Sequence, residues 1–227
     1  KVDLALSERP VFERYGSRPE QTLASPIVAP SLDYVYDGWV DIISGKPSRE
    51  PGLWCACCTA LDPSLAPAGK HTLWLSQFAP FELSSGESWD DLQEQVADQV
   101  VDTFCKYAPN TKAAILGRLI TSPVEWQRLT DNPRGCAWHV DMELHQAWGL
   151  RPLPELSQYR TPIPNLYLTG SGTHPGGGIT GLPGRNAAME VLRDLGHRAP
   201  RRGVASRVRE WLGLYRSFRR FAEITAR

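Results

Sequence analysis

The sequence predicts an α/β protein, because short strand patterns recur among longer helical ones along its 227 residues. Apolar residues make up 41% of the chain and charged residues 22%, which is typical of a globular protein with a buried core. The most specific feature is a cluster of seven glycines within residues 170–184. It lies between a short apolar run and a helical pattern. A strand, a glycine-rich turn and a helix in this order bring bare backbone N–H groups against an anionic or electron-accepting cofactor.

Strands and one helix are expected in the first eighty or so residues. Residues 1–8 alternate apolar and polar side chains and predict a strand, whereas residues 9–30 are rich in proline and serine and predict a loop. A helical stripe follows over residues 31–43. Residues 53–60 and 71–78 predict two strands, and the turn sequences between them indicate an antiparallel pair.

The middle of the chain predicts a long helix. Residues 88–91, Ser-Trp-Asp-Asp, resemble a capping box, and apolar residues then recur every three or four positions until Pro109 ends the pattern. Residues 113–121 predict a strand and residues 123–129 a short helix. Residues 136–150 fit neither pattern.

The glycine cluster lies between two further predicted elements. Residues 166–168, Leu-Tyr-Leu, predict a buried strand after a Pro-rich crossing segment over residues 151–164. A helix is expected after the cluster, with Gly196 as its C-terminal cap. The cluster opens with the G-x-G of Gly170-Ser171-Gly172, which no glycine at position 175 extends to the G-x-G-x-x-G dinucleotide fingerprint. It predicts either tight turns at positive φ or a backbone surface cleared for a flat cofactor ring.

Charge and cysteine content exclude several classes of protein. The formal net charge is zero, which argues against a general nucleic-acid binder. The five cysteines are odd in number and lack the paired C-x-x-C spacing of a metal site, so no metal is expected. They are expected to be free thiols in a reducing compartment: the cytoplasm, or the mitochondrial matrix in a eukaryote. No run reaches the roughly 18 apolar residues of a membrane span.

The C-terminal segment, residues 197–227, has a pattern of its own. It holds nine Arg and two Glu, and its apolar residues recur at three- and four-residue steps. They are Val204, Val208, Trp211, Leu212, Tyr215, Phe218 and Phe221. This pattern predicts a basic amphipathic helix, which either makes peripheral contact with an anionic membrane or packs on this protein or a partner.

A resemblance to a known family rests on residues 169–188, T-G-S-G-T-H-P-G-G-G-I-T-G-L-P-G-R-N-A-A. This segment resembles the C-terminal signature of the phytoene desaturase-like FAD-dependent oxidoreductases. Residues 61–67, L-D-P-S-L-A-P, and residues 107–109, Y-A-P, are similar to the same family. So are several spaced residues, namely Gly135, His139, Met142, Gln146, Arg151 and Pro152. The resemblance covers about residues 1–195.

The resemblance implies the C-terminal half of a two-domain flavoprotein. Residues 1–160 would be mostly a substrate domain with a mixed sheet, and residues 161–196 the last strand and helix of a Rossmann-like FAD-binding domain. Residues 197–227 would be the amphipathic tail. The chain begins with lysine and lacks the N-terminal G-x-G-x-x-G. We therefore expect a fragment or a processed chain, with the FAD-domain half missing or supplied by a separate chain.

The resemblance also assigns site residues. Those expected to face FAD are Gly170, Ser171, Gly172, Gly177, Gly178, Ile179, Thr180 and Gly181. His174 and His139 are candidates for acid–base catalysis, with hydrogen-bonded structural histidines as the alternative. Trp138, Met142 and Gln146 are candidates for the substrate pocket. A helix N-terminus beside the flavin would stabilise negative charge on the reduced ring.

The expected function is dehydrogenation of a small, lipophilic substrate, with a hydride passing from a substrate carbon to flavin N5. Two alternatives remain open. One is a non-catalytic remnant or interaction module that uses the basic tail to bind a membrane or a partner. The other is an amine-oxidase-type flavoenzyme, whose aromatic cage would fall to Trp138 and Trp148.

Overall fold

A computed structural model describes residues 1–12, 26–139, 141 and 143–197. The chain divides into two compact units, unit 1 at Lys1–Ala137 and unit 2 from Trp138 onward. The predicted amphipathic tail lies outside the described residues, apart from His197. No helix within the described ranges is long and apolar enough to cross a membrane.

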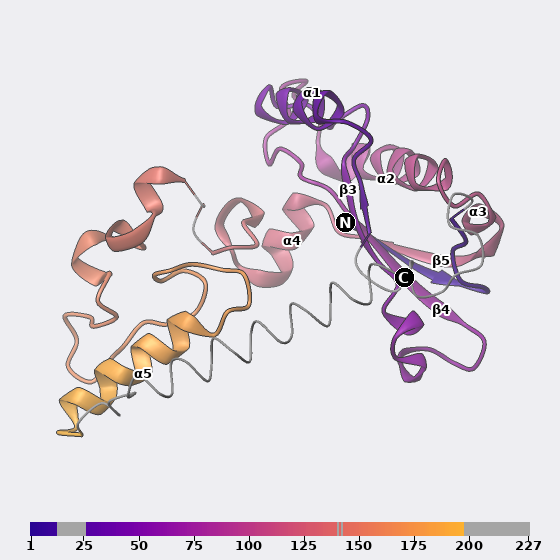
Figure 1. Ribbon diagram of the computed structural model, residues 1–227. Helices are drawn as coiled ribbons and strands as arrows, with labels where there is room; N and C mark the ends of the chain where they lie inside the picture. The colour runs from indigo at the N-terminus through magenta and orange to yellow at the C-terminus, as the bar shows by residue number, and fades with distance from the viewer. Residues whose placement is uncertain (13–25, 140, 142, 198–227) are drawn as a thin grey trace. The chain divides into compact units, whose positions relative to one another are not determined.

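Unit 1 is built on a five-stranded sheet in the order β2-β3-β4-β1-β5 (Figure 1). The strands are β1 Val2–Leu6, β2 Ile27–Val28, β3 Leu53–Ala56, β4 His71–Ser76 and β5 Ile115–Ile120. The antiparallel pairing of β3 with β4 confirms that prediction. The expectation of a mixed sheet is wrong for the described strands, because all four ladders are antiparallel. The reason is that β1 lies between β4 and β5 and runs opposite to both.

The helices of unit 1 are α1 Leu32–Ile43, α2 Trp89–Cys105, α3 Asn110–Ala114 and α4 Pro123–Thr130. The predicted long helix begins where its cap was expected, since the Ser88 hydroxyl accepts a hydrogen bond from the Asp90 N–H at 3.0 Å. The five-residue helix α3 was not predicted, because so short a segment gives no helical period.

The core of unit 1 lies between one face of the sheet and α2 (Figure 1). Alternate residues of β1 are buried, as the period-two pattern predicts. From α2, Ala97, Val100, Val101 and Phe104 join the same cluster. Phe104 has no exposed surface, and the Phe12 ring meets it edge-on at 5.6 Å between centroids. This cluster gives unit 1 its main hydrophobic stabilisation.

The apolar stripe that predicts α1 faces away from this core. Leu32, Tyr36 and Ile43 are 88%, 68% and 67% exposed, and Gly38 is the buried residue of the helix. A Cβ on Gly38 would stand 3.0 Å from the Ser48 hydroxyl oxygen, so the glycine allows the helix to approach the following loop. Unit 1 therefore presents an outward-facing apolar helix surface.

The cysteines of unit 1 differ sharply in accessibility. Cys55 is fully buried, and burial raises the pKa of its thiol to about 12. Burial also raises the pKa of Cys57, whereas Cys58 is exposed. Because the thiolate is the reactive form, brief iodoacetamide treatment at neutral pH is expected to alkylate Cys58 and spare Cys55 until unfolding. Mass spectrometry of digested protein measures this, and early modification of Cys55 would contradict the described β3.

The described part of unit 2 contains one long helix, α5 Leu182–Asp194, preceded by short 3₁₀ turns and the glycine run. The predicted buried strand at residues 166–168 is wrong for the described chain. Leu166 is 46% exposed, and Tyr167 makes a single antiparallel bridge, to Arg160. Residues 159–161 pair with this segment on one side, and the described part of unit 2 supplies no strand on the other side.

Residues 159–168 are joined to α5 by polar contacts. The Arg160 guanidinium donates to Asp194 at 2.8 and 3.0 Å and also pairs with Glu190. The Tyr167 hydroxyl donates to Asp194 at 2.7 Å. Together Arg160 and Tyr167 lower the pKa of Asp194 to about 2. These contacts fix the C-terminal half of α5 and leave its N-terminus to the glycine run.

Candidate functional site

The glycine run before α5 adopts a backbone that other residues avoid. Gly170, Gly176, Gly178 and Gly181 all have positive φ. A Cβ added to Gly170 or Gly181 would meet no atom within 4 Å, and one on Gly178 would meet only the Thr180 methyl at 3.8 Å. Open space therefore lies in front of these three glycines.

The same run presents a row of unpaired donors. None of the five N–H groups from Gly177 to Gly181 donates a hydrogen bond to another described residue. The next N–H, of Leu182, reaches only the Thr180 hydroxyl at 3.3 Å. Gly181 is the N-cap of α5 without a side-chain cap. The row thus coincides with the positive end of a thirteen-residue helix.

Ile179 stands out within this row. Its side chain is fully exposed, at 105% of the reference value, and its φ is +56°. A β-branched residue in the left-handed region is strained, and such strain collects at ligand sites.

Trp138 lies directly on the glycine run. A Cβ on Gly177 would come within 2.3 Å of Trp138 Cε3 and 2.5 Å of Cζ3. Only a glycine fits beneath this ring, which stays 37% exposed. The structure thus brings together a predicted substrate-pocket residue and a predicted cofactor residue.

The two candidate histidines have different surroundings. His174 is half-buried, and its Nδ1 atom is buried without a hydrogen-bond partner among the described residues. Its carbonyl accepts from the Tyr159 hydroxyl at 2.8 Å, and that hydroxyl accepts from Asn186 Nδ2 at 2.8 Å. His139 is exposed with a φ of +64°. The described hydrogen bonds do not join His139 to His174, so they form no acid–base pair there.

The structure describes only some of the remaining candidates for the substrate pocket and the aromatic cage. Gln146 has a buried Oε1 without a partner in the described chain, so an acceptor is left over there. Met142 lies outside the described residues. Trp148 belongs to a 3₁₀ turn, Trp148–Leu150.

Two residues outside the predicted site list organise unit 2. Arg151 is 1% exposed and donates to the carbonyls of Trp138, Asp141 and Ser171. Tyr159 joins the His174 carbonyl to α5. Arg151 belongs to the family motif without a predicted site role, whereas no sequence signal marks Tyr159.

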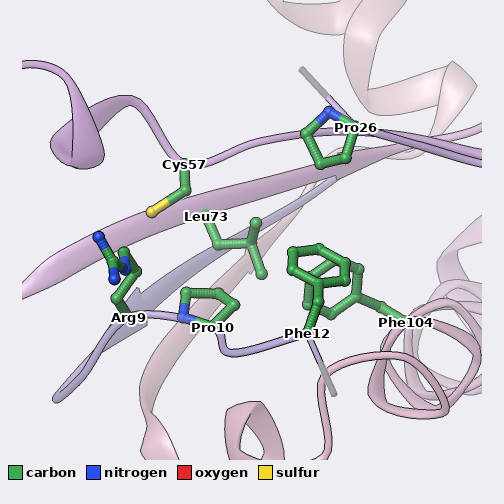
Figure 2. Close-up of a pocket in the computed structure, with 7 residues that line it drawn as sticks. All are labelled: Arg9, Pro10, Phe12, Pro26, Cys57, Leu73 and Phe104. Carbon is green, nitrogen blue, oxygen red and sulfur yellow. The ribbon is translucent and has the colours of Figure 1, made fainter. Parts of the chain in front are cut away.

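A small apolar pocket lies elsewhere, in unit 1 (Figure 2). Its lining residues are Arg9, Pro10, Phe12, Pro26, Cys57, Leu73 and Phe104. It belongs to the margin of the core and contains no predicted site residue. Within the described ranges, no group of His, Cys, Asp or Glu side chains is suited to hold a metal ion.

No family model matches the chain. It is 37% identical over 203 residues to pyridine nucleotide-disulfide oxidoreductase domain-containing protein 2 of Rattus norvegicus, and 40% identical over 203 residues to the Mus musculus protein. Each match covers 86% of this chain and 35% of the relative. A phytoene desaturase (neurosporene-forming) of Cereibacter sphaeroides is 26% identical over 169 residues, covering 73% of this chain and 31% of that protein.

The chain thus spans about a third of the length of the curated relatives it matches. The resemblance found in residues 169–188 is confirmed at the level of whole-sequence similarity. This chain is a homologue of part of pyridine nucleotide-disulfide oxidoreductase domain-containing protein 2 and, at lower identity, of part of the phytoene desaturases.

Proposed function

We propose that this chain supplies the flavin-facing part of an FAD-dependent oxidoreductase of the dehydrogenase or desaturase type. One observation carries the proposal: the five consecutive N–H groups from Gly177 to Gly181 donate to no other described residue, and they lie at the N-terminus of α5 beside glycines that face open space. This arrangement fits a flat, electron-accepting ring that gains negative charge on reduction. When bound, FAD would accept a hydride at N5 from a substrate carbon.

The chain's own residues have binding and orienting roles in this proposal. The N–H groups of Gly178, Ile179 and Thr180 would donate to the flavin edge, and the helix end would stabilise its charge. Gly170, Ser171 and Gly172 would lie along the rest of the cofactor. Exposed Ile179 and the Trp138 ring would exclude water from the reacting face.

The buried orphan atoms fit the same site. His174 Nδ1 and Gln146 Oε1 each lack a partner among the described residues, and an unpaired buried polar atom is costly. In the proposal, His174 holds or accepts a proton beside the substrate, and Gln146 orients the substrate. His139 is exposed, so we assign it no step.

The proposal includes a second polypeptide region. No G-x-G-x-x-G stands in the N-terminal part of this sequence to hold the pyrophosphate, and about two thirds of each curated relative lies outside the matched region. That region would complete the FAD-binding domain, to which residues 161–196 contribute. The outward apolar face of α1 gives unit 1 a surface that further polypeptide can cover.

The test is a spectrum of the chain with added FAD after desalting. The chain is tested alone and co-expressed with the part of the rat relative that it does not cover. A retained flavin band near about 450 nm is expected in at least the co-expressed sample. Gly178→Ala should weaken retention, because φ at this position is +99°. Loss of all flavin from both samples would overturn the proposal.

A further inference from the structure

Among the described residues of unit 2, Arg151 is the most deeply buried cation. It is 1% exposed and is the largest fully buried side chain of the described residues. Burying a guanidinium is expensive unless its donors are satisfied in a fixed geometry. Its surroundings therefore have to be organised around it.

The guanidinium joins two segments that are far apart in sequence. Nε and Nη2 both donate to the Ser171 carbonyl, at 2.9 and 2.6 Å. Nη1 donates to the Asp141 carbonyl at 2.8 Å, and Nη2 also donates to the Trp138 carbonyl at 3.1 Å. One side chain thus holds residues 138–141 against the start of the glycine run.

These hydrogen bonds of the Arg151 guanidinium, called the Arg151 clamp from here on, affect both ends of the glycine run. The Trp138 ring lies on Gly177, so fixing the Trp138 backbone also fixes the ring that covers the N–H row. At the other end, two charged donors polarise the Ser171–Gly172 peptide group. The N–H of that peptide belongs to Gly172 and has no acceptor among the described residues. A polarised N–H is a stronger donor to an anionic group.

We propose that Arg151 is a positioning residue for the proposed cofactor site: it joins the Trp138 and Asp141 carbonyls to the Ser171 carbonyl and thereby holds the glycine run in a conformation that can bind an anionic ligand. This inference rests on the proposed flavin function for the identity of the ligand. The clamp itself is independent of that identity. Arg151 touches backbone carbonyls rather than the ligand, so it acts through Trp138 and Ser171.

The first arm of the test is hydrogen exchange of the full chain carrying Arg151→Lys. Lysine keeps the charge but lacks the planar fork that reaches three carbonyls. Residues 138–147 and 170–181 are expected to exchange at least about tenfold faster, while α5 and unit 1 keep their wild-type protection. Arg160→Lys is the matched control, because Arg160 pairs with Asp194 and Glu190 at the surface of the same unit. It should leave both segments unchanged.

The second measurement is the NMR chemical shift of one amide proton, which loss of packing alone would not change in the expected direction. The amide proton of Gly172 should shift upfield in Arg151→Lys, because its peptide loses two charged donors. Unchanged exchange in both segments would overturn the inference. Uniform loss of protection that includes α5, or failure of the variant to fold, would also overturn it, because Arg151 would then be an ordinary core residue.

FAD titration of the same proteins separates this inference from the proposed function. If wild type binds FAD, Arg151→Lys should bind it at least about tenfold more weakly. Faster exchange with unchanged FAD affinity would overturn the link to the ligand. If wild type and its co-expressed complex bind no FAD, the proposed function fails, and the exchange and amide-shift results still decide whether Arg151 positions the glycine run.

Discussion

Replacing Gly177 by valine is expected to lower the affinity for FAD by about tenfold to a hundredfold. A Cβ at this position would stand 2.3 Å from Trp138 Cε3, a separation that real structures do not tolerate. Overpacking of this kind costs about 1–3 kcal/mol, and each 1.4 kcal/mol is about a tenfold change in affinity. The ring must leave the glycine run, so the surface proposed to face the flavin is disturbed. FAD titration by flavin fluorescence measures the effect, in the co-expressed complex if the chain alone retains no flavin.

Gly149→Ala provides the control in the same unit. A Cβ at Gly149 would meet nothing within 4 Å, and its φ lies outside the left-handed region. Its FAD affinity should equal that of wild type. Equal affinities for Gly177→Val and Gly149→Ala would show that the Trp138 contact has no bearing on cofactor binding.

Phe104→Ala is expected to have the largest effect on stability, lowering the free energy of unfolding of unit 1 by about 3–5 kcal/mol. Phe104 has no exposed surface and joins α2 to the sheet and to Phe12. Hydrogen exchange of β1 and β4 measures this unit without interference from unit 2. Leu116→Ala on β5 is the control, since Leu116 is 60% exposed and should change stability by less than about 0.5 kcal/mol. Similar costs for both variants would contradict the described core.

The elements predicted correctly are those with a strong local signal. The helix at α2 has a cap, an apolar face and a proline shortly after its end, and the β3–β4 pair has turn residues between its strands. Each of these signals arises within a few residues and does not depend on distant contacts. The direction of β1 relative to its neighbours depends on long-range pairing, so the antiparallel sheet could not be predicted locally.

Two other differences between the predictions and the structure also arise because local sequence patterns do not report long-range contacts. The apolar run at residues 166–168 has strand propensity, but burial would require neighbouring strands that the described part of unit 2 lacks. The stripe on α1 predicts an amphipathic helix correctly, yet periodicity cannot tell whether the apolar face meets this unit or another surface.

The sequence located the glycine run of the candidate site but not the side-chain contacts that hold it in place. Glycine spacing and the family signature located the run from Gly170 to Gly181 before α5. The packing of Trp138 on Gly177 and the contacts of Arg151 with the Trp138, Asp141 and Ser171 carbonyls depend on tertiary structure, because the residues in contact are ten or more positions apart. Sequence periodicity contains no information about such contacts.

The most direct test of the central claim is a map of where FAD binds. Hydrogen exchange is measured with and without saturating FAD, on the chain or on its co-expressed complex. We expect protection in this chain to be greatest in residues 170–181, where the N–H groups of Gly177 to Gly181 have no acceptor among the described residues. FAD binding that leaves these residues unprotected, or protects only residues of unit 1, would contradict the account.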